Sequence, residues 1–206
     1  MRTDEGQAFP VYIAVVAGLL FLAFAYFAVG QAASTRNSAQ TAADAAALAA
    51  AQDAREQLRE GWLGVILDPD QWGGFLKGDT YVDASACDSA ADFASRNGAE
   101  LAEPGCEPLS SEENGFRVTV LTTGGEANPA TASAGAVIEP RCMFEKPEPP
   151  PEPPTAPPSP PPSGEPEEEE PGPILGLTCG GEPWDIDPED PHLPGATDLF
   201  TVRLSE

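Results

Sequence analysis

The feature that most constrains this chain is an uncharged stretch close to its start. No charged residue stands between Glu5 and Arg36, and residues 8–30 are almost entirely apolar. As an α-helix this stretch would be about 35 Å long, enough to cross a hydrocarbon core of about 30 Å. The apolar region of a cleaved secretory signal is shorter, about 7–15 residues. We therefore expect a retained membrane anchor, while small residues at Ala32 and Ala33 leave signal cleavage open.

The sequence after this stretch, residues 31–60, predicts that the helix continues. Alanine is the strongest helix former, and neither Gly nor Pro interrupts the run before Gly61. Small side chains recur at steps of three and four residues, the spacing of one helix face, and Leu58 completes the row. These are Ala39, Ala43, Ala46, Ala50 and Ala54. Such a stripe lets another helix approach closely. It is interpreted here as an interface with identical or related helices; the alternative is packing on the chain's own domain.

The charge balance excludes some classes of partner. The chain has 34 acidic and 10 basic side chains, a formal net charge of -24. Nucleic-acid binding needs clustered Lys and Arg to neutralise phosphates, so no nucleic-acid partner is expected. Binding to anionic lipid through a basic patch is disfavoured for the same reason. We favour a solvated, self-repelling body over an acidic binding surface.

Residues 147–173 are dominated by proline and glutamate, with 14 Pro and 7 Glu among 27 positions. Proline donates no backbone hydrogen bond and the glutamates repel one another, so no packed core can form there. An extended, disordered Pro/Glu-rich insertion is expected, acting as a spacer.

The chain has four cysteines: Cys87, Cys106, Cys142 and Cys179. None forms a CxxC pair, and the single His192 has no ligand-like spacing to them, which disfavours a zinc site. An even number of cysteines after an apolar segment is typical of disulfides in an oxidising compartment. Three pairings are open. We favour Cys87–Cys106 and Cys142–Cys179, because the second pair would tie together the ends of the insertion.

The remaining segments predict an α+β body. Residues 62–77 are apolar and then rich in turn formers, so they should end the long helix and pack against the body. A helix is expected over residues 85–97. Three strands are expected over residues 116–122, 135–141 and 199–204. A small antiparallel sheet with one or two helices would result, and disulfides would support its limited core.

No pattern in the sequence indicates catalysis. The chain has no HExxH, no GxSxG and no phosphate-cradling glycine loop, so no enzymatic activity and no cofactor are expected. The sharpest candidate for a cation site is the acidic run at residues 184–192. It holds Asp185, Asp187, Glu189 and Asp190. It lacks the spacing and the glycine of an EF-hand, so a solvated acidic loop is the preferred interpretation.

Residues 6–54, GQAFPVYIAVVAGLLFLAFAYFAVGQAASTRNSAQTAADAAALAAAQDA, resemble the N-terminal segment of TadE/TadG-like proteins. These belong to bacterial tight-adherence (Tad, Flp-type) pilus and secretion systems. The most specific part is AQTAADAAALAAA at Ala39–Ala51, directly after the apolar helix. A weaker similarity, CDSAADFASRNGAEL at Cys87–Leu101, is to small actinobacterial TadE-like proteins. The high alanine and proline content is also associated with actinobacteria.

The resemblance implies a role and also shows a departure from the family's pattern. Prepilin-like members are cut after a glycine and carry Glu at the fifth mature position. A cut after Gly6 would make Gln7 the first residue and Val11 the fifth. The resemblance therefore implies a membrane-anchored structural or accessory component, like a minor pseudopilin. Its partners would be membrane lipid and, through the N-terminal helix, other Tad/Flp pilus or secretion components.

The expected location is the cell membrane or cell surface, with a single span and the C-terminal body outside the cytoplasm. The alternative function is an anchored envelope-binding module that uses its acidic body. The expected organisation is a leader at 1–7, a transmembrane helix at 8–30, an Ala-rich helix at 31–60, an α+β body at 61–146 and 174–206, and a disordered Pro/Glu-rich linker at 147–173.

Overall fold

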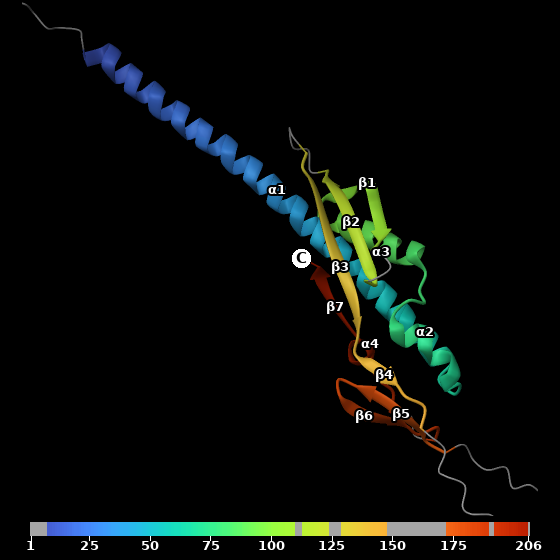
Figure 1. The fold of residues 1–206 in the computed structure, drawn as a ribbon. Coiled ribbons are helices and arrows are strands. Elements are labelled where there is room, and N and C mark those ends of the chain that lie inside the picture. Colours follow the sequence, from blue (N-terminus) through green and yellow to red (C-terminus); the bar gives the residue numbers. More distant parts are fainter. Residues whose placement is uncertain (1–7, 110–112, 124–128, 148–171, 190–191, 206) are drawn as a thin grey trace, which may run out of the picture.

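A computed structural model describes residues 8–109, 113–123, 129–147, 172–189 and 192–205. Its longest element is α1, Ala8–Gly64, an unbroken helix of 57 residues. At 1.5 Å per residue α1 is about 85 Å long. Its first half projects beyond the rest of the molecule, and its second half packs against the body (Figure 1). The predicted α+β class, with a long N-terminal helix leading into a disulfide-bonded body, is confirmed.

In the described residues, three further α-helices and one short 3₁₀ helix follow α1. After α1 ends at Gly64, a turn leads into η1, Pro69–Gln71, and α2, Trp72–Lys77. The predicted helix near residues 85–97 is α3, Asp83–Arg96. The last helix is the short α4, Ala196–Leu199.

Seven strands in the described part of the chain form two antiparallel sheets. The larger sheet has the order β1-β2-β3-β7, and the smaller has the order β4-β5-β6. The strands are β1 Ala99–Pro108, β2 Gly115–Thr122, β3 Thr131–Pro140, β4 Cys142–Phe144, β5 Ile174–Cys179, β6 Glu182–Ile186 and β7 Phe200–Ser205. Only Arg141 separates β3 from β4, so one extended segment passes from one sheet into the other.

The body has two layers. One face of the larger sheet covers α1, which contacts β2, β3 and β7, while α3 packs beside α1 and under β1 (Figure 1). The register places Phe116, Ala136 and Leu204 opposite one another on that inner face. Alternate residues of β2 point inward because side chains alternate along a strand, and Phe116, Val118 and Val120 are fully buried.

The start of β2 needs a glycine. Gly115 has a φ of +148°, and a Cβ there would collide with the carbonyl oxygen of Ala136 on β3. Only glycine adopts this backbone conformation without a steric penalty. Gly115 therefore allows β2 and β3 to approach closely where the pair begins.

Two disulfides join the elements, with the pairing favoured from the sequence. Cys87–Cys106 links α3 to β1, and Cys142–Cys179 links β4 to β5, where the two cysteines face each other in register. The Pro/Glu-rich insertion leaves the body after Pro147 and returns by Gly172; residues 148–171 lie outside the described part of the chain.

Candidate membrane span and surfaces of the body

The first half of α1 is an apolar surface that nothing in the described chain covers. Its most apolar window has a mean hydropathy of 2.4, and none of that window is buried. Large side chains there are exposed on every side, from 49% for Ile13 to 83% for Tyr26. A helix that is apolar all round is normally enclosed by lipid or by other helices. In the described part of the chain, α1 is the one helix long and apolar enough to cross a membrane.

A short polar segment separates the apolar half of α1 from the body. We call residues 31–38 the collar. It is helical and largely exposed, and the first fully buried residue after it is Ala39. Ala39 lies nine residues after Gly30, which corresponds to about 13 Å of helix. Each polar headgroup layer is about 5–8 Å thick. If Gly30 marks the end of the hydrocarbon core, the body stands clear of the lipid headgroups.

The alanine stripe is buried within the chain itself. Ala39, Ala43, Ala46, Ala50 and Ala54 have no exposed surface, and Leu58 continues the row. In the structure α1 meets α3 on one side and the larger sheet on the other. Small side chains are needed because α3 and the larger sheet both pack closely against α1. The interpretation of this stripe as an interface with another chain is therefore corrected: it packs on the chain's own domain.

Polar side chains fix α3 against α1. The Asp53 carboxylate accepts hydrogen bonds from Gln57 at 2.6 Å, from Ser85 at 3.1 Å and from Ser89 at 3.2 Å. The Gln57 side-chain oxygen also accepts a hydrogen bond at 2.8 Å from the backbone N–H of Val82, immediately before α3. These contacts anchor the start of α3. The pattern was not recognised from the sequence, although Asp53–Gln57 and Ser85–Ser89 each have the four-residue spacing of neighbours on one helix face.

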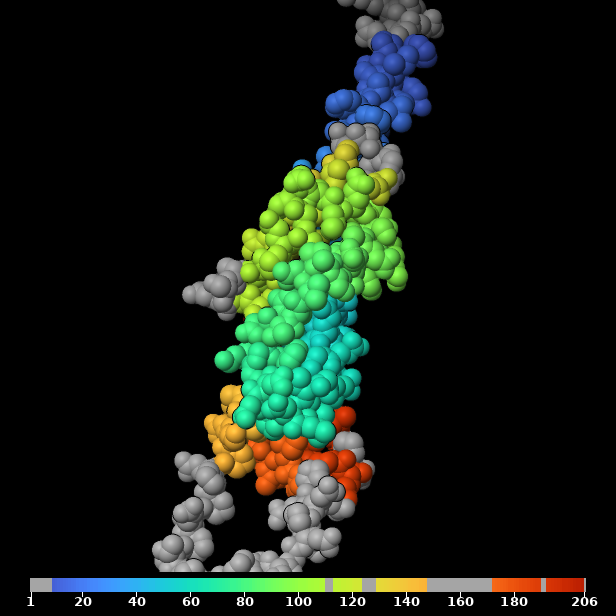
Figure 2. Space-filling model, turned by 90° about the vertical axis from the view of Figure 1, so that its right-hand side faces the viewer, coloured from blue at the N-terminus to red at the C-terminus, as the bar shows by residue number. Residues whose placement is uncertain are grey.

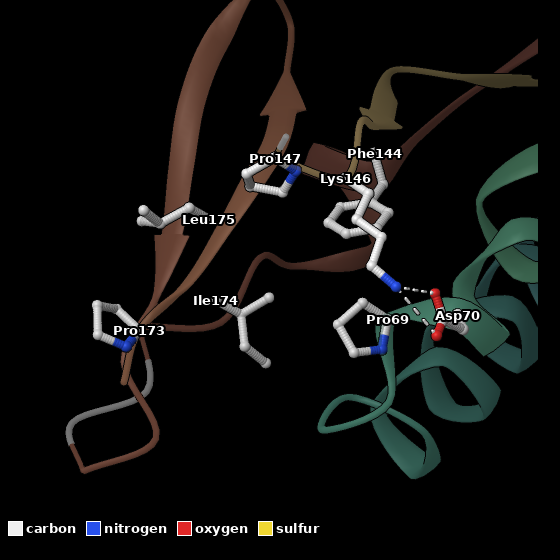
Figure 3. A pocket seen from close by; sticks show the side chains of 8 residues that line it. All are labelled: Pro69, Asp70, Phe144, Lys146, Pro147, Pro173, Ile174 and Leu175. Carbon is white, nitrogen blue, oxygen red and sulfur yellow. Dashed lines mark hydrogen bonds and ion pairs between the residues drawn. The ribbon is translucent and has the colours of Figure 1, made fainter. Parts of the chain in front are cut away.

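A groove of about 280 Å³ lies at the end of the body farthest from the apolar half of α1. Its walls are Pro69, Asp70, Phe144, Lys146, Pro147, Pro173, Ile174 and Leu175 (Figure 3). Lys146 donates to Asp70 at 2.9 Å, and both side chains are more than 70% exposed. The groove is thus apolar with one exposed ion pair at its rim, and it lies where the insertion leaves the body and returns.

The acidic run at residues 184–192 forms no cation site in the described residues. Asp185 lies within β6, whereas Asp187 and Glu189 follow it in a turn where the Asp187 carboxylate accepts from the Glu189 N–H at 2.9 Å. Among the residues that the structure describes, no group of three His, Cys, Asp or Glu side chains could hold a metal ion. Asp190 lies outside those residues. The indole of Trp184 stacks on His192 and donates to its carbonyl at 2.7 Å.

Among the groups on residues that the structure describes, Tyr81 and Glu139 have shifted pKa values. Burial, with a smaller contribution from the nearby Asp83, raises the pKa of Tyr81. The Nε–H of Arg203 donates a hydrogen bond to the Glu139 carboxylate at 2.9 Å. This hydrogen bond lowers the pKa of Glu139. Glu139 is on β3 and Arg203 on β7, so this exposed pair bridges two strands.

The candidate leader cleavage point, between Gly6 and Gln7, lies outside the described residues, which begin at Ala8.

Comparison with family models gives one match. Residues 6–53 match the Tad family, described as Flp pilus-assembly TadE/G-like. The matched segment covers the apolar half of α1, the collar and the first turns buried in the body, roughly a quarter of the chain. Comparisons with curated proteins and with solved structures gave no significant match.

Proposed function

The chain carries a Tad-like N-terminal segment on a candidate membrane-spanning helix, and from this premise we propose that it is a membrane-anchored structural component of a Tad/Flp-type pilus or secretion system. Its role is that of an accessory subunit like a minor pseudopilin. The apolar half of α1 packs among lipid and the helices of other Tad components. The C-terminal body stands outside the cytoplasm.

One observation carries the proposal. A single unbroken helix has one half exposed and apolar and the other half sealed under its own sheet. The large apolar side chains of the first half are exposed, so that half remains available for an assembly. The matched segment spans both halves, which links the family resemblance to this arrangement.

The orientation of the body rests on its disulfides. All four cysteines are paired, and all four lie after the apolar half of α1. Disulfides persist in oxidising compartments and are rare in the cytosol. A body that needs two of them is expected on the outer side of the membrane.

Shear fractionation of cells that carry a C-terminally tagged full-length chain tests the role. A tag recovered in sheared filaments, on a chain that begins at Gln7, indicates a processed filament subunit. A full-length chain that stays in the membrane and co-purifies with Tad components indicates an anchored accessory subunit. A chain that neither enters filaments nor binds any Tad component contradicts the proposal.

Thiol labelling of intact cells tests the orientation, because the chain has no free cysteine to interfere. A Ser133→Cys variant carries its new thiol on β3 of the body and is expected to react with a membrane-impermeant maleimide. In a chain that keeps its first six residues, a Thr3→Cys variant, on the other side of the span, is the matched control and should react only after lysis. The reverse pattern would place the body in the cytoplasm.

A further inference from the structure

The larger sheet has two edge strands, β1 and β7, which differ in how they are protected. The edge of a sheet carries N–H and C=O groups that can pair with a strand of another chain. Proteins usually block an edge with proline, an irregular register or a covering element. Figure 2 shows the body from the side of β1, where α3 lies beside that strand, and β7 lies at the opposite end of the sheet (Figure 1).

The edge at β1 is blocked in each of these ways. The Cys87–Cys106 disulfide holds β1 to α3, and the register with β2 is interrupted just before Cys106. The Leu109 N–H donates to the Gly115 carbonyl at 2.9 Å, so the backbone groups of the preceding Pro108 point away from β2. Proline has no N–H, so this position offers no donor to a further strand. Another strand would find few places to pair with β1.

The edge at β7 has no such protection in the described residues. β7 contains no proline, its register with β3 is regular along its whole length, and β3 is its one partner strand there. Its charged side chain, Arg203, is held by Glu139 of β3, to which its Nε–H donates at 2.9 Å. β7 therefore presents a regular strand edge to the surroundings.

The alternation of hydrogen bonds along β7 shows which backbone groups lie at that edge. The Arg141 N–H donates to the Leu199 carbonyl at 2.8 Å, so these residues form a hydrogen-bonded pair that continues the β3–β7 register. In an antiparallel pair such positions alternate with positions whose N–H and C=O groups point away from the partner strand. The groups that point away from β3 are those of Phe200, Val202 and Leu204. They form a row of donors and acceptors along the outer side of β7.

The side chains at this edge indicate what a pairing strand would carry. Val202 and Leu204 face the inner layer but stay partly exposed, Leu204 at 38%, since the described residues place no strand beyond β7. A cavity of about 270 Å³ opens at the end of β7, with Gln40 and Asp44 of α1 and Ser205 of β7 among its walls. A strand paired with β7 would thus set apolar side chains beside Val202 and Leu204, and a polar side chain at the cavity.

A second copy of the chain does not fit this edge when both copies are anchored in one membrane. β7 runs roughly antiparallel to α1 (Figure 1). Antiparallel pairing of β7 with its own copy needs a two-fold axis, which would turn the apolar half of the second α1 in the opposite direction. A copy in the same orientation would instead bring its β1 to β7, and that edge is blocked by Pro108 and its interrupted register.

We infer that β7 accepts a strand from a different protein of the same assembly, added antiparallel to its outer edge. The partner is an extended, proline-free segment with apolar side chains at alternate positions. Hydrogen bonds to the main chain of β7 hold it, and the alternate side chains give selectivity, as in other cases of strand addition. The inference deepens the proposed function and rests on it, because it takes the body to stand outside the membrane among other subunits.

Hydrogen exchange resolved to single amides tests the pairing in the full-length chain. In vesicles of phosphatidylethanolamine and phosphatidylglycerol that hold the purified chain alone, the amides of Thr201 and Arg203 should exchange about a hundred-fold more slowly than those of Phe200, Val202 and Leu204. In membranes of cells that produce the chain with its Tad system, the latter three should become protected to a similar degree. Unchanged exchange in those membranes overturns the inference. Equal protection in the vesicles also overturns it, in favour of a second copy.

Val202→Pro tests the same edge by substitution. Proline removes the outward N–H of residue 202 but no hydrogen bond to β3, and sheets tolerate proline at such edge positions. The variant should keep both disulfides, and protection of the Leu204 amide in cell membranes should fall about five- to ten-fold. Val202→Thr keeps the N–H and the branched shape, so it is the matched control and should retain protection. Full protection in folded Val202→Pro contradicts the inference; if the variant does not fold, exchange in the unsubstituted chain decides.

Co-purification from the same membranes separates failure of this inference from failure of the proposed function. Tad components recovered with a chain whose β7 edge stays unprotected would mean that the inference fails and the proposed function stands. Protection at β7 without any Tad component would refute the proposed function, while the pairing of β7 with a different protein would stand.

Discussion

Trp62 and Trp72 meet edge to face, with ring centroids 5.3 Å apart, where the long helix ends. Trp62 is the last fully buried side chain of α1, and Trp72 opens α2. Phe144 on β4 continues the cluster, its ring centroid 4.7 Å from that of Trp72. The Trp72 indole N–H also donates to the carbonyl of Val65 at 3.1 Å. The end of α1 is thus joined to the smaller sheet through aromatic rings.

Replacing Trp72 should destabilise the body. Trp72→Ala removes a fully buried ring and a hydrogen bond, and we expect a loss of about 3–5 kcal/mol in the free energy of unfolding. Urea unfolding of the detergent-solubilised chain, followed by near-UV circular dichroism, measures it. Leu67→Ala is the control, since Leu67 is 71% exposed. Equal effects of the two substitutions would mean that the cluster does not stabilise the fold.

Asp53 should matter more to stability than an exposed acid of the same kind. Asp53→Ala leaves Ser85, Ser89 and Gln57 without their common acceptor, and the expected loss is about 1–3 kcal/mol. Asp92→Ala breaks an exposed pair of neighbours on one helix and should cost about 0.5 kcal/mol or less. The same unfolding measurement compares the two. A smaller loss for Asp53→Ala than for Asp92→Ala contradicts the anchoring role of Asp53.

A larger side chain at Ala46 distinguishes the two interpretations of the alanine stripe. Ala46 is fully buried between α1 and the body, so Ala46→Leu should destabilise the isolated chain by about 1–3 kcal/mol through overpacking. Ala91→Leu, at an exposed position of α3, should change stability little. Unchanged stability of monomeric Ala46→Leu, with loss of assembly only, would restore the interpretation in which the stripe meets another chain.

Tyr81 should weaken the fold at alkaline pH. Burial raises the pKa of its hydroxyl above the ordinary value of 10.0, and Asp83 raises it further. Well below pH 10 the Tyr81 hydroxyl is protonated in both the folded and the unfolded chain. As the pH rises past about 10, the unfolded chain loses this proton first, so the free energy of unfolding falls. Tyr81→Phe should flatten this fall between about pH 9 and 11. An unchanged slope would show that other groups cause it.

The sequence correctly predicted those helices and strands that have one strong pattern. The uncharged run and the alanines predicted the long helix, and alternation in Phe116–Thr122 predicted β2. The end of α1 fell at Gly64 instead of near residue 60, because Trp62 is held in the core and the chain stays helical past Gly61. Helix propensity alone does not register that packing.

Other elements were missed because their residues disfavour strands. The segment of β1, AELAEPGCEP, contains two prolines and a glycine, and it forms a strand because it lies at a sheet edge with an irregular register between Leu101 and Cys106. β6 includes Pro183 and Asp185, the first acid of the run that was expected to be a loop. The sequence also did not determine whether the alanine stripe packs in the chain's own core or against another chain's helix. Small residues suit a domain core and a helix–helix interface equally.

The Cys142–Cys179 bond has a consequence for proteolysis of the chain. The two half-cystines sit on neighbouring strands, and every residue from 143 to 178 lies between them along the chain. A single cut anywhere in the proline- and glutamate-rich segment opens this covalent ring without releasing a fragment. Such a molecule would migrate as two pieces only after reduction. Its smaller sheet would stay covalently joined through the disulfide although the backbone is cut.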